Sequence, residues 1–346
     1  SRLISHMKHI PSEIQMNFSL IICTYQRAAS LIRLMDSVLM QRSYPNEVLV
    51  IDGSSDYSTR DMLDAKKYPG LCYYKVTENN RGLTKQRNFG LEKVSPETEI
   101  VCFLDDDIVL DPCYFENLLE TYQSRPNAVG VGGSIVSENT WRLAKNEIPD
   151  FSEYMMEGYI RKLGSRNVLR KKLGLLSEER PGIMPRFSHG FSIGFLPPTG
   201  KTYAVEFFMG GVASYRISLF KKIKFSEYFI GYGLYEDMDF CLRASKIGQL
   251  YVNTAAKCEH LHEEAGRPDR FKYGKMVVQN GWIVWKEKYP NPDVESILKW
   301  NTITLLLAII RIKNAFGDNE KGALQDAMGR FAAWFKLGIR KPVKID

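Results

Sequence analysis

The stretch Ile100-Val101-Cys102-Phe103-Leu104-Asp105-Asp106-Asp107 joins a short apolar run to three consecutive aspartates. A continuous apolar run of this length is typical of a strand that is buried on both faces of a sheet. In an open parallel sheet, ligands gather outside the carboxyl ends of the strands. The stretch therefore predicts a buried strand that delivers acidic side chains to such an edge.

Other apolar runs of the same kind surround this one. Each is short, continuous and followed by a polar loop, and helical stretches such as 28–40 and 113–122 lie between them. Strands that alternate with helices predict a parallel sheet covered by helices. We therefore expect an α/β fold with a Rossmann-like, mostly parallel central sheet flanked by helices. The runs are 18–23, 48–51, 72–76 and 128–131.

The 346 residues divide into five predicted segments. A tail covers 1–16, and the alternation of strands and helices lasts from 17 to 136. Periodicity weakens over 137–203, where basic residues, glycine and proline are frequent, so we expect an insertion of loops and short helices. Regular structure returns in 204–270. The last segment, 271–346, is expected to be a helical C-terminal extension with two helices.

The net charge of +7 comes from basic residues that cluster in 161–186 and 311–344. Such clustering favours an anionic partner, either nucleotide phosphates or anionic lipid. Nucleic acid is not expected, because the sequence has no recognition helix, zinc finger or RNA-binding motif. The six cysteines form no Cys-x-x-Cys pair and no secretory signal is evident, which indicates a cytoplasmic protein.

The C-terminal extension contains a basic amphipathic helix. Leu324, Met328, Phe331 and Phe335 recur at helical spacing, with arginine and lysine around them. Such a helix can lie at the inner face of the cell membrane, or it can pack on the rest of the protein, and both interpretations stay open. The apolar core of 297–313 is too short to span a bilayer of about 30 Å.

Three consecutive aspartates create a repulsion that a cation would remove. If strand alternation continues, Asp105 and Asp107 point to one face and Asp106 to the other. Two carboxylates about 4 Å apart repel each other by roughly 4 kcal/mol at an effective dielectric constant near 20. A hard divalent cation prefers oxygen ligands, which predicts Mg²⁺ or Mn²⁺. The alternative is a helix cap before Pro112.

A second acidic cluster, which contains Glu236 and Asp237, opens a predicted helix over 235–246. The helix dipole favours acidic residues in a first turn by about 0.3–1 kcal/mol each, which explains one or two of them. Gly231 and Gly233, just before the helix, would let the backbone approach a ligand closely. The cluster is therefore a second candidate site.

Two further stretches carry groups that bind anions or metals. Cations and amides concentrate in 79–88, where they could hold a diphosphate, although an exposed basic helix face explains Lys85 equally well. His260 and His262 follow a short strand and alternate, so only one can face the site. His260 is the better candidate for a metal or phosphate role.

Taken together, these pieces resemble the inverting family-2 glycosyltransferases of the GT-A fold. The resemblance covers 17–267, and it depends on the order of the motifs more than on any one of them. The motifs are 19–25 (SLIICTY), 50–56 (VIDGSSD), 80–82 (NRG) leading into 86–90 (QRNFG), 103–107 (FLDDD) and 235–239 (YEDMD).

The resemblance implies a role for most of the candidate residues. Thr24 and Asp52 would contact the nucleotide, and Arg87 would lie near the diphosphate. Asp105 and Asp107 would form an Asp-x-Asp pair at the metal, with Asp107 the direct ligand and Asp105 nearer the ribose. The position of His260 matches that of a histidine often found near the metal and diphosphate.

The resemblance also implies the reaction, an inverting transfer from a nucleoside-diphosphate sugar to an acceptor hydroxyl. Asp237 would be the general base, although the spacing does not exclude Glu236. The donor half would be 17–136 and the acceptor half 204–270. UDP or dTDP is favoured because Asp52 suits the imide N–H of uracil or thymine. The expected acceptor is a glycan or lipid-linked glycan, as in cell-surface polysaccharide synthesis.

Two other functions stay as alternatives. A sugar nucleotidyltransferase also uses a Rossmann-like domain and metal-binding carboxylates, but it normally has a glycine-rich loop after the first strand. Residues 24–29 contain no glycine. A non-catalytic binding module of the GT-A fold is the other alternative, and the joint presence of Asp105, Asp107 and Asp237 argues against it.

Overall fold

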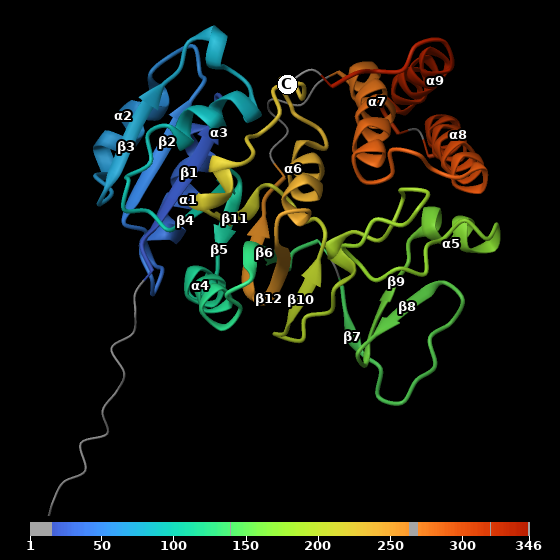
Figure 1. Ribbon diagram of the computed structural model, residues 1–346, viewed down its shortest axis with the longest axis horizontal. Coiled ribbons are helices and arrows are strands. Elements are labelled where there is room, and N and C mark those ends of the chain that lie inside the picture. Colours follow the sequence, from blue (N-terminus) through green and yellow to red (C-terminus); the bar gives the residue numbers. More distant parts are fainter. Residues whose placement is uncertain (1–15, 139, 263–268, 319, 345–346) are drawn as a thin grey trace, which may run out of the picture.

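The computed structural model describes residues 16–138, 140–262, 269–318 and 320–344. The predicted tail, 1–16, lies outside the described residues except for Met16. The described part has an α/β fold, with a central sheet and a group of C-terminal helices to one side of it (Figure 1).

The strands of the central sheet are β1 (Phe18–Thr24), β2 (Glu47–Asp52), β3 (Leu71–Lys75), β4 (Ile100–Asp105), β5 (Ile108–Leu110), β6 (Ala128–Ile135), β10 (Thr202–Val205), β11 (Val212–Arg216) and β12 (Gln249–His260). Their order is β10-β12-β6-β11-β4-β1-β2-β3, and β5 pairs with the end of β12. Strands β3, β2, β1 and β4 are parallel, as are β6 and β12. Strands β11, β10 and β5 are antiparallel to their neighbours. The sheet is thus mostly parallel, as predicted.

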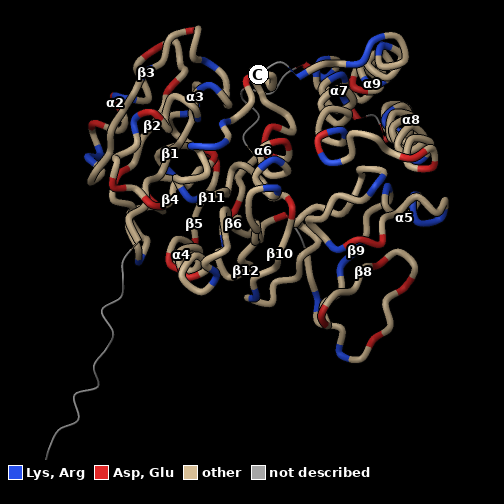
Figure 2. The backbone as a smooth tube through the Cα atoms, in the orientation of Figure 1, with Lys and Arg blue, Asp and Glu red and all other residues tan. Residues whose placement is uncertain are grey.

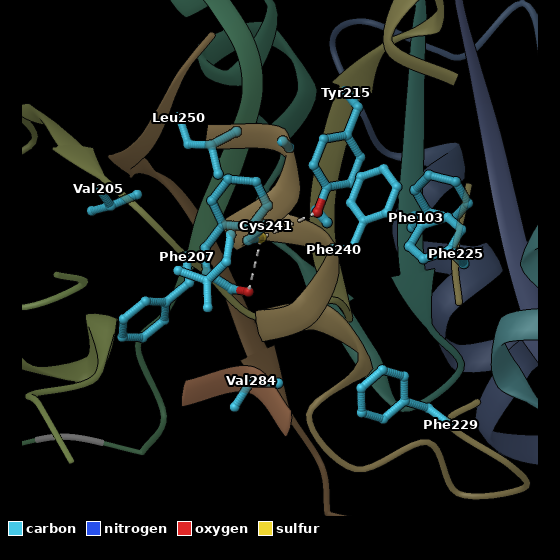
Figure 3. Close-up of a cluster of buried hydrophobic side chains, with 14 of the residues drawn as sticks. Phe103, Val205, Phe207, Tyr215, Phe225, Phe229, Phe240, Cys241, Leu250 and Val284 are labelled. Carbon is cyan, nitrogen blue, oxygen red and sulfur yellow. Dashed lines mark hydrogen bonds between the residues drawn. The ribbon is translucent and has the colours of Figure 1, made fainter. Parts of the chain in front are cut away.

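Helices cover both faces of the sheet (Figure 1). Because side chains alternate along a strand, Leu20 packs with Leu34 of α1 on one face, whereas Ile21 belongs to the core of the other face. Figure 3 shows part of that second core, where Phe103 of β4 lies near Phe240 of α6. The helices and 3-10 turns are α1 (Ala28–Leu39), α2 (Ser58–Lys66), η1 (Glu78–Asn80), α3 (Leu83–Leu91), α4 (Tyr114–Ser124), η3 (Ile217–Lys221) and α6 (Glu236–Ser245).

The strand register aligns the carboxyl ends that carry the predicted site. Thr24 of β1 is opposite Asp52 of β2, and Cys23 is opposite Asp105 of β4. All three strands are parallel, so the polar residues that follow them emerge at one edge of the sheet.

The segment 137–203 differs from the prediction. It contains a three-stranded antiparallel sheet of β7 (Arg142–Leu143), β8 (Glu153–Met156) and β9 (Tyr159–Lys162), as well as α5 (Ser165–Lys172) and the 3-10 turn η2 (Ile193–Phe195). Short helices were expected, and the strands were not. Strands of two to four residues are too short for alternation to be visible in the sequence.

The described part of the C-terminal extension forms three helices, α7 (Arg270–Lys288), α8 (Val294–Gly317) and α9 (Ala323–Ile339), where two were predicted. These helices pack on the α6 side of the sheet, because Val284, Trp300 and Leu337 belong to the same core as Phe240. Helix α7 was missed because its apolar residues do not gather on one face.

Helix α9 packs through small residues and exposes large ones. Ala327 and Ala333 are buried, and a side chain added at Gly329 would meet the backbone oxygen of Phe271 in α7. The predicted apolar stripe points outward instead, with Met328 55% and Phe335 65% exposed. The helix therefore packs on the protein and still presents an apolar surface.

Among the helices of the described residues, none combines the length and the apolar character needed to cross a lipid bilayer.

Candidate active site

The three aspartates after β4 have different surroundings. Asp106 is 4% exposed and accepts hydrogen bonds from Thr24 Oγ1 at 2.7 Å and Arg27 Nη1 at 3.0 Å. Burial raises the pKa of its carboxyl to about 6, although both donors oppose the shift. Asp106 therefore contacts Thr24 and Arg27, but it still lines the same cavity as Asp105. Strand β4 ends at Asp105, so alternation does not extend to Asp106, and the prediction that Asp106 points away from the site was wrong.

Asp107 lies beside His260, the last residue of β12, and near His262 just after it. Nε2 of His260 is 3.2 Å from Asp107 Oδ1, and Nδ1 of His260 is 2.8 Å from Glu138 Oε1. His262 also contacts Glu138, at 3.2 Å. The pairing of β5 with β12 places His260 opposite Ile108 and so brings it to Asp107. Two segments far apart in the sequence thus meet at this point.

The donor atoms around Asp107 fit a divalent cation. Carboxylate oxygens and an imidazole nitrogen suit Mg²⁺ or Mn²⁺. Hydrogen bonds to Asp107 and Glu138 raise the pKa of His260 to about 10, so the ring is an imidazolium that already places positive charge between the two carboxylates. A metal ion would replace that charge, and His260 would bind it in its neutral form.

Sequence reasoning missed Glu138. It lies three residues after β6, and β6 is parallel to β4 because both are antiparallel to β11. Glu138 is therefore the first acidic residue beyond another carboxyl end at the same edge of the sheet. This position after a strand is the feature of the sequence from which Glu138 could have been predicted as a site residue.

Arg87 of α3 is a buried cation beneath the site. It is 3% exposed, its Nη1 lies 2.5 Å from Glu236 Oε1, and its Nη2 lies 3.6 Å from Asp105 Oδ1. Burial alone would lower the pKa of Arg87, but the carboxylates of Glu236 and Asp105 raise it above its usual value. The guanidinium thus joins the end of β4 to the start of α6.

Glu236 and Asp237, the two candidate bases, differ in their exposure. Glu236 is 5% exposed and bound to Arg87. Asp237 is half-buried, and its carboxylate accepts hydrogen bonds from the backbone N–H of Gly210 at 3.1 Å and of Met238 at 2.7 Å. Burial raises the pKa of Asp237, and the two N–H donors oppose that shift. Asp237 is the more accessible of the two.

A cavity of about 630 Å³ brings several predicted residues together. Thr24, Arg87, Asp105 and Asp237 line it, together with the glycine-containing turns before α6 and β11. The cavity is therefore bounded by the carboxyl edge of the parallel strands on one side and by α6 on the other. Figure 2 shows acidic and basic residues mixed around these elements.

Asp107 and His260 are not among the residues that line this cavity, and neither is Asp52. It is 0% exposed, and its carboxylate accepts hydrogen bonds from Ser54 N–H and from the Tyr73 hydroxyl. By contrast, Arg27 and Arg81 line the cavity and were not singled out from the sequence. Arg81 follows the third predicted strand, within the stretch where cations were noted.

Residues 19–182 match the family model described as Glycosyl transferase family 2. The matched segment belongs to glycosyl transferase family 2. This family-2 segment contains β1 to β4, the three aspartates and Glu138, whereas α6 and His260 lie beyond it.

One curated relative of the family-2 segment is the glucosyl-dolichyl phosphate glucuronosyltransferase of Haloferax volcanii. It is 32% identical over 146 residues, which is 41% of this chain and 45% of the relative. The match thus spans less than half of that relative's length.

Solved structures support the GT-A fold for this chain. A mannosyltransferase from Pyrobaculum calidifontis, solved with GDP-Man and Mn²⁺, has a TM-score of 0.52 at 18% identity, over 92% of this chain and 86% of that one. S. aureus TarS residues 1–349, solved with UDP-GlcNAc, has a TM-score of 0.50 at 16% identity, over 94% and 82%. At such identities the likeness shows the fold.

Proposed function

We propose that the protein transfers a sugar from a nucleoside diphosphate to an acceptor hydroxyl with inversion at the anomeric carbon. The observation that carries this proposal is the cavity that Asp105 and Asp237 line together. Asp105 belongs to the strand edge where nucleotides bind in folds of this kind, and Asp237 offers a half-buried carboxylate across the cavity.

In this proposal Asp237 is the general base. Its carboxylate takes the proton from the acceptor hydroxyl while that oxygen forms a bond to the anomeric carbon. The bond from that carbon to the phosphate oxygen breaks, and the nucleoside diphosphate leaves with the electron pair. Hydrogen bonds from Gly210 and Met238 hold the carboxylate in one orientation. Glu236 is a weaker candidate because Arg87 already binds it.

Asp107 and His260 would hold a Mg²⁺ or Mn²⁺ ion, with Asp105 close by. The ion would supply positive charge to the diphosphate as it leaves. The mannosyltransferase structure described above contains Mn²⁺, which supports a divalent ion of this kind. Arg81 and Arg87, which both line the cavity, would add positive charge from the chain itself.

The donor is proposed to carry UDP or dTDP. Thr24 lines the cavity and would lie near the nucleotide, but its hydroxyl is bonded to Asp106. Asp52 could bind an imide N–H only if its carboxylate released Ser54 or Tyr73. A preference for uracil or thymine through Asp52 therefore requires a local rearrangement of the hydrogen bonds at the end of β2.

The acceptor is proposed to be a lipid-linked glycan or another cell-surface glycan, reached at the inner face of the membrane. The name of the Haloferax volcanii relative specifies a dolichyl phosphate substrate for that enzyme. In this chain, the exposed apolar side chains of α9 and the basic residues around them fit an interfacial helix.

A thermal-shift panel of nucleoside diphosphates, each with and without Mn²⁺, tests the donor part of the proposal. A ligand that binds the native state raises the melting temperature according to its affinity. We expect UDP or dTDP to stabilise the protein in the presence of Mn²⁺ and much less without it. If no nucleotide has an effect, the enzyme proposal fails. Proton NMR of the first sugar released by donor hydrolysis then tests inversion.

A further inference from the structure

A second cavity, of about 580 Å³, lies between the insertion and the C-terminal helices. Its walls come from α5, α7 and α8 and from the loop between α5 and β10. Ser192, Phe207, Tyr235 and Met238 line both this cavity and the active-site cavity. The two cavities are therefore neighbours, and Tyr235 and Met238 at their boundary flank the Glu236–Asp237 pair.

The charged residues of this cavity are all basic. Arg166, Arg170 and Arg330 line it, together with the neutral His189, and the described lining includes no aspartate or glutamate. Arg330 is neutralised by Asp326, at 2.7 Å. Arg166 is exposed and has no ion pair within the described part of the chain. Figure 2 shows basic residues along α5. Arg166 and Arg170 both belong to this helix.

Arg170 is a buried cation without a carboxylate partner. It is 6% exposed, and its guanidinium donates to Asn167 Oδ1 at 3.1 Å and to the carbonyl oxygens of Leu175 and His189. Its Nε is buried and has no hydrogen-bond partner among the described residues. Burial and the charge of Arg166 lower its pKa to about 10. A buried charge normally has an ionic partner, so an anion is the missing component here.

The first turn of α5 adds to this positive potential. Ser165, Arg166 and Asn167 line the cavity, and the N-cap Gly164 provides no side-chain cap. The N–H groups at a helix start carry a partial positive charge and favour phosphate-like ligands. The helix start and the two unpaired arginines therefore act on the same volume.

The opposite wall of the cavity is apolar. Val277, Val278 and Val284 of α7 line it, together with Trp300 and Leu307 of α8. Trp300 stacks on Trp285 with ring centroids 5.4 Å apart, which makes this wall rigid. A ligand that fits the whole cavity has an anionic group at α5 and an apolar part along α7 and α8.

We propose that this cavity binds the phosphate group of an amphipathic acceptor through Arg166, Arg170 and the start of α5. The apolar part of the acceptor lies against α7 and α8, and its sugar reaches Asp237 past Tyr235 and Met238. This assignment rests on the proposed function and adds the chemical class of the acceptor. The proposed acceptor is a phosphate ester with a hydrocarbon chain.

Isothermal titration calorimetry tests the assignment with three probes: decyl phosphate below its critical micelle concentration, decanol and inorganic phosphate. We expect the wild-type protein to bind decyl phosphate at least tenfold more tightly than either fragment. Arg166→Ala and Arg170→Leu should each weaken that binding by about tenfold or more, since each removes a charged hydrogen-bond donor. Lys172→Ala is the matched control, because Lys172 is an exposed cation of α5 that does not line the cavity.

Each outcome decides the proposal. The anion site is overturned if decanol binds as tightly as decyl phosphate. It is also overturned if Lys172→Ala weakens the binding of decyl phosphate as much as Arg166→Ala and Arg170→Leu do. Inorganic phosphate that binds as tightly as decyl phosphate overturns the amphipathic acceptor and leaves a free phosphate site. The nucleotide thermal shift of the same variants is the separate readout. If it is absent in the wild type while decyl phosphate binds, the proposed function fails and the phosphate site stands. If it is present and decyl phosphate does not bind, this inference alone fails.

Discussion

Nη1 of Arg87 lies 2.5 Å from Oε1 of Glu236, and both side chains are almost fully buried. The same guanidinium reaches Asp105 at 3.6 Å. A single cation therefore connects the acidic end of β4 to the first turn of α6, which carries Asp237. The relative positions of donor and acceptor groups depend on this contact.

Arg87→Met should destabilise the protein by about 3–5 kcal/mol, because it leaves the buried Glu236 without a counter-ion. Urea unfolding measures the change. Lys85→Met in the same helix is the control and should lie within about 0.5 kcal/mol of wild type. The double variant Arg87→Met/Glu236→Leu should recover much of the loss. Two single losses that simply add would show that the pair does not interact.

Asp237→Asn should lower the turnover number by about 10²–10⁴-fold, since the amide cannot accept the acceptor's proton. The nucleotide thermal shift should stay as in wild type, because the donor half is intact. Glu236→Gln is the comparison variant. Its main effect should be a loss of stability, because it weakens the contact with Arg87. Full activity of Asp237→Asn, measured as nucleoside diphosphate release, would remove Asp237 from the base role.

Asp107→Asn should weaken Mn²⁺-dependent nucleotide binding by about tenfold or more, because a neutral amide is a poorer ligand for a hard cation. Titration of Mn²⁺ in the thermal-shift assay measures this effect. A chelator should abolish the shift in the wild type, and Mn²⁺ should restore it. Asp64→Asn, an exposed carboxylate of α2, is the control. An unchanged Mn²⁺ titration in Asp107→Asn would place the metal elsewhere.

His189 should make the protein less stable as the pH falls from about 6.5 to 4. Burial and the charges of Arg170 and Arg330 lower its pKa to about 4, so below pH 6.5 the unfolded chain binds a proton that the native state does not. The expected loss reaches about 2–3 kcal/mol at pH 4. In His189→Gln this part of the loss should disappear, as urea unfolding across the range would show. Parallel curves for the two proteins would contradict the assignment.

Met328→Ser/Phe335→Ser should reduce binding to vesicles that contain anionic lipid, because both side chains are exposed apolar groups of α9. Flotation of the full chain measures the bound fraction. Ile148→Ser is the control, since Ile148 is 91% exposed but lies in the insertion. An equal bound fraction for the double variant and the wild type would mean that α9 does not contact the membrane.

The sequence alone was sufficient for the fold class and the position of the acidic edge. Buried strands such as 100–104 can be recognised in the sequence by their continuous apolar runs. The polar residues that follow such a run must lie at the end of a strand. Strand alternation did not separate Asp106 from Asp105 at the site, because β4 ends at Asp105 and both residues line the cavity. The sequence was not sufficient for 137–203, where the strands are short. It was also not sufficient for α7, which has no single apolar face.

Only the tertiary structure decided which side chains meet. Glu138 and His260 are 122 residues apart and come together because β6 pairs with β12, and no local pattern encodes that pairing. The same holds for Arg87 and Glu236, which are 149 residues apart, and for the basic cavity between α5 and the C-terminal helices. Burial and alternation depend on neighbours along the chain, whereas ion pairs and cavities depend on register and packing between distant segments.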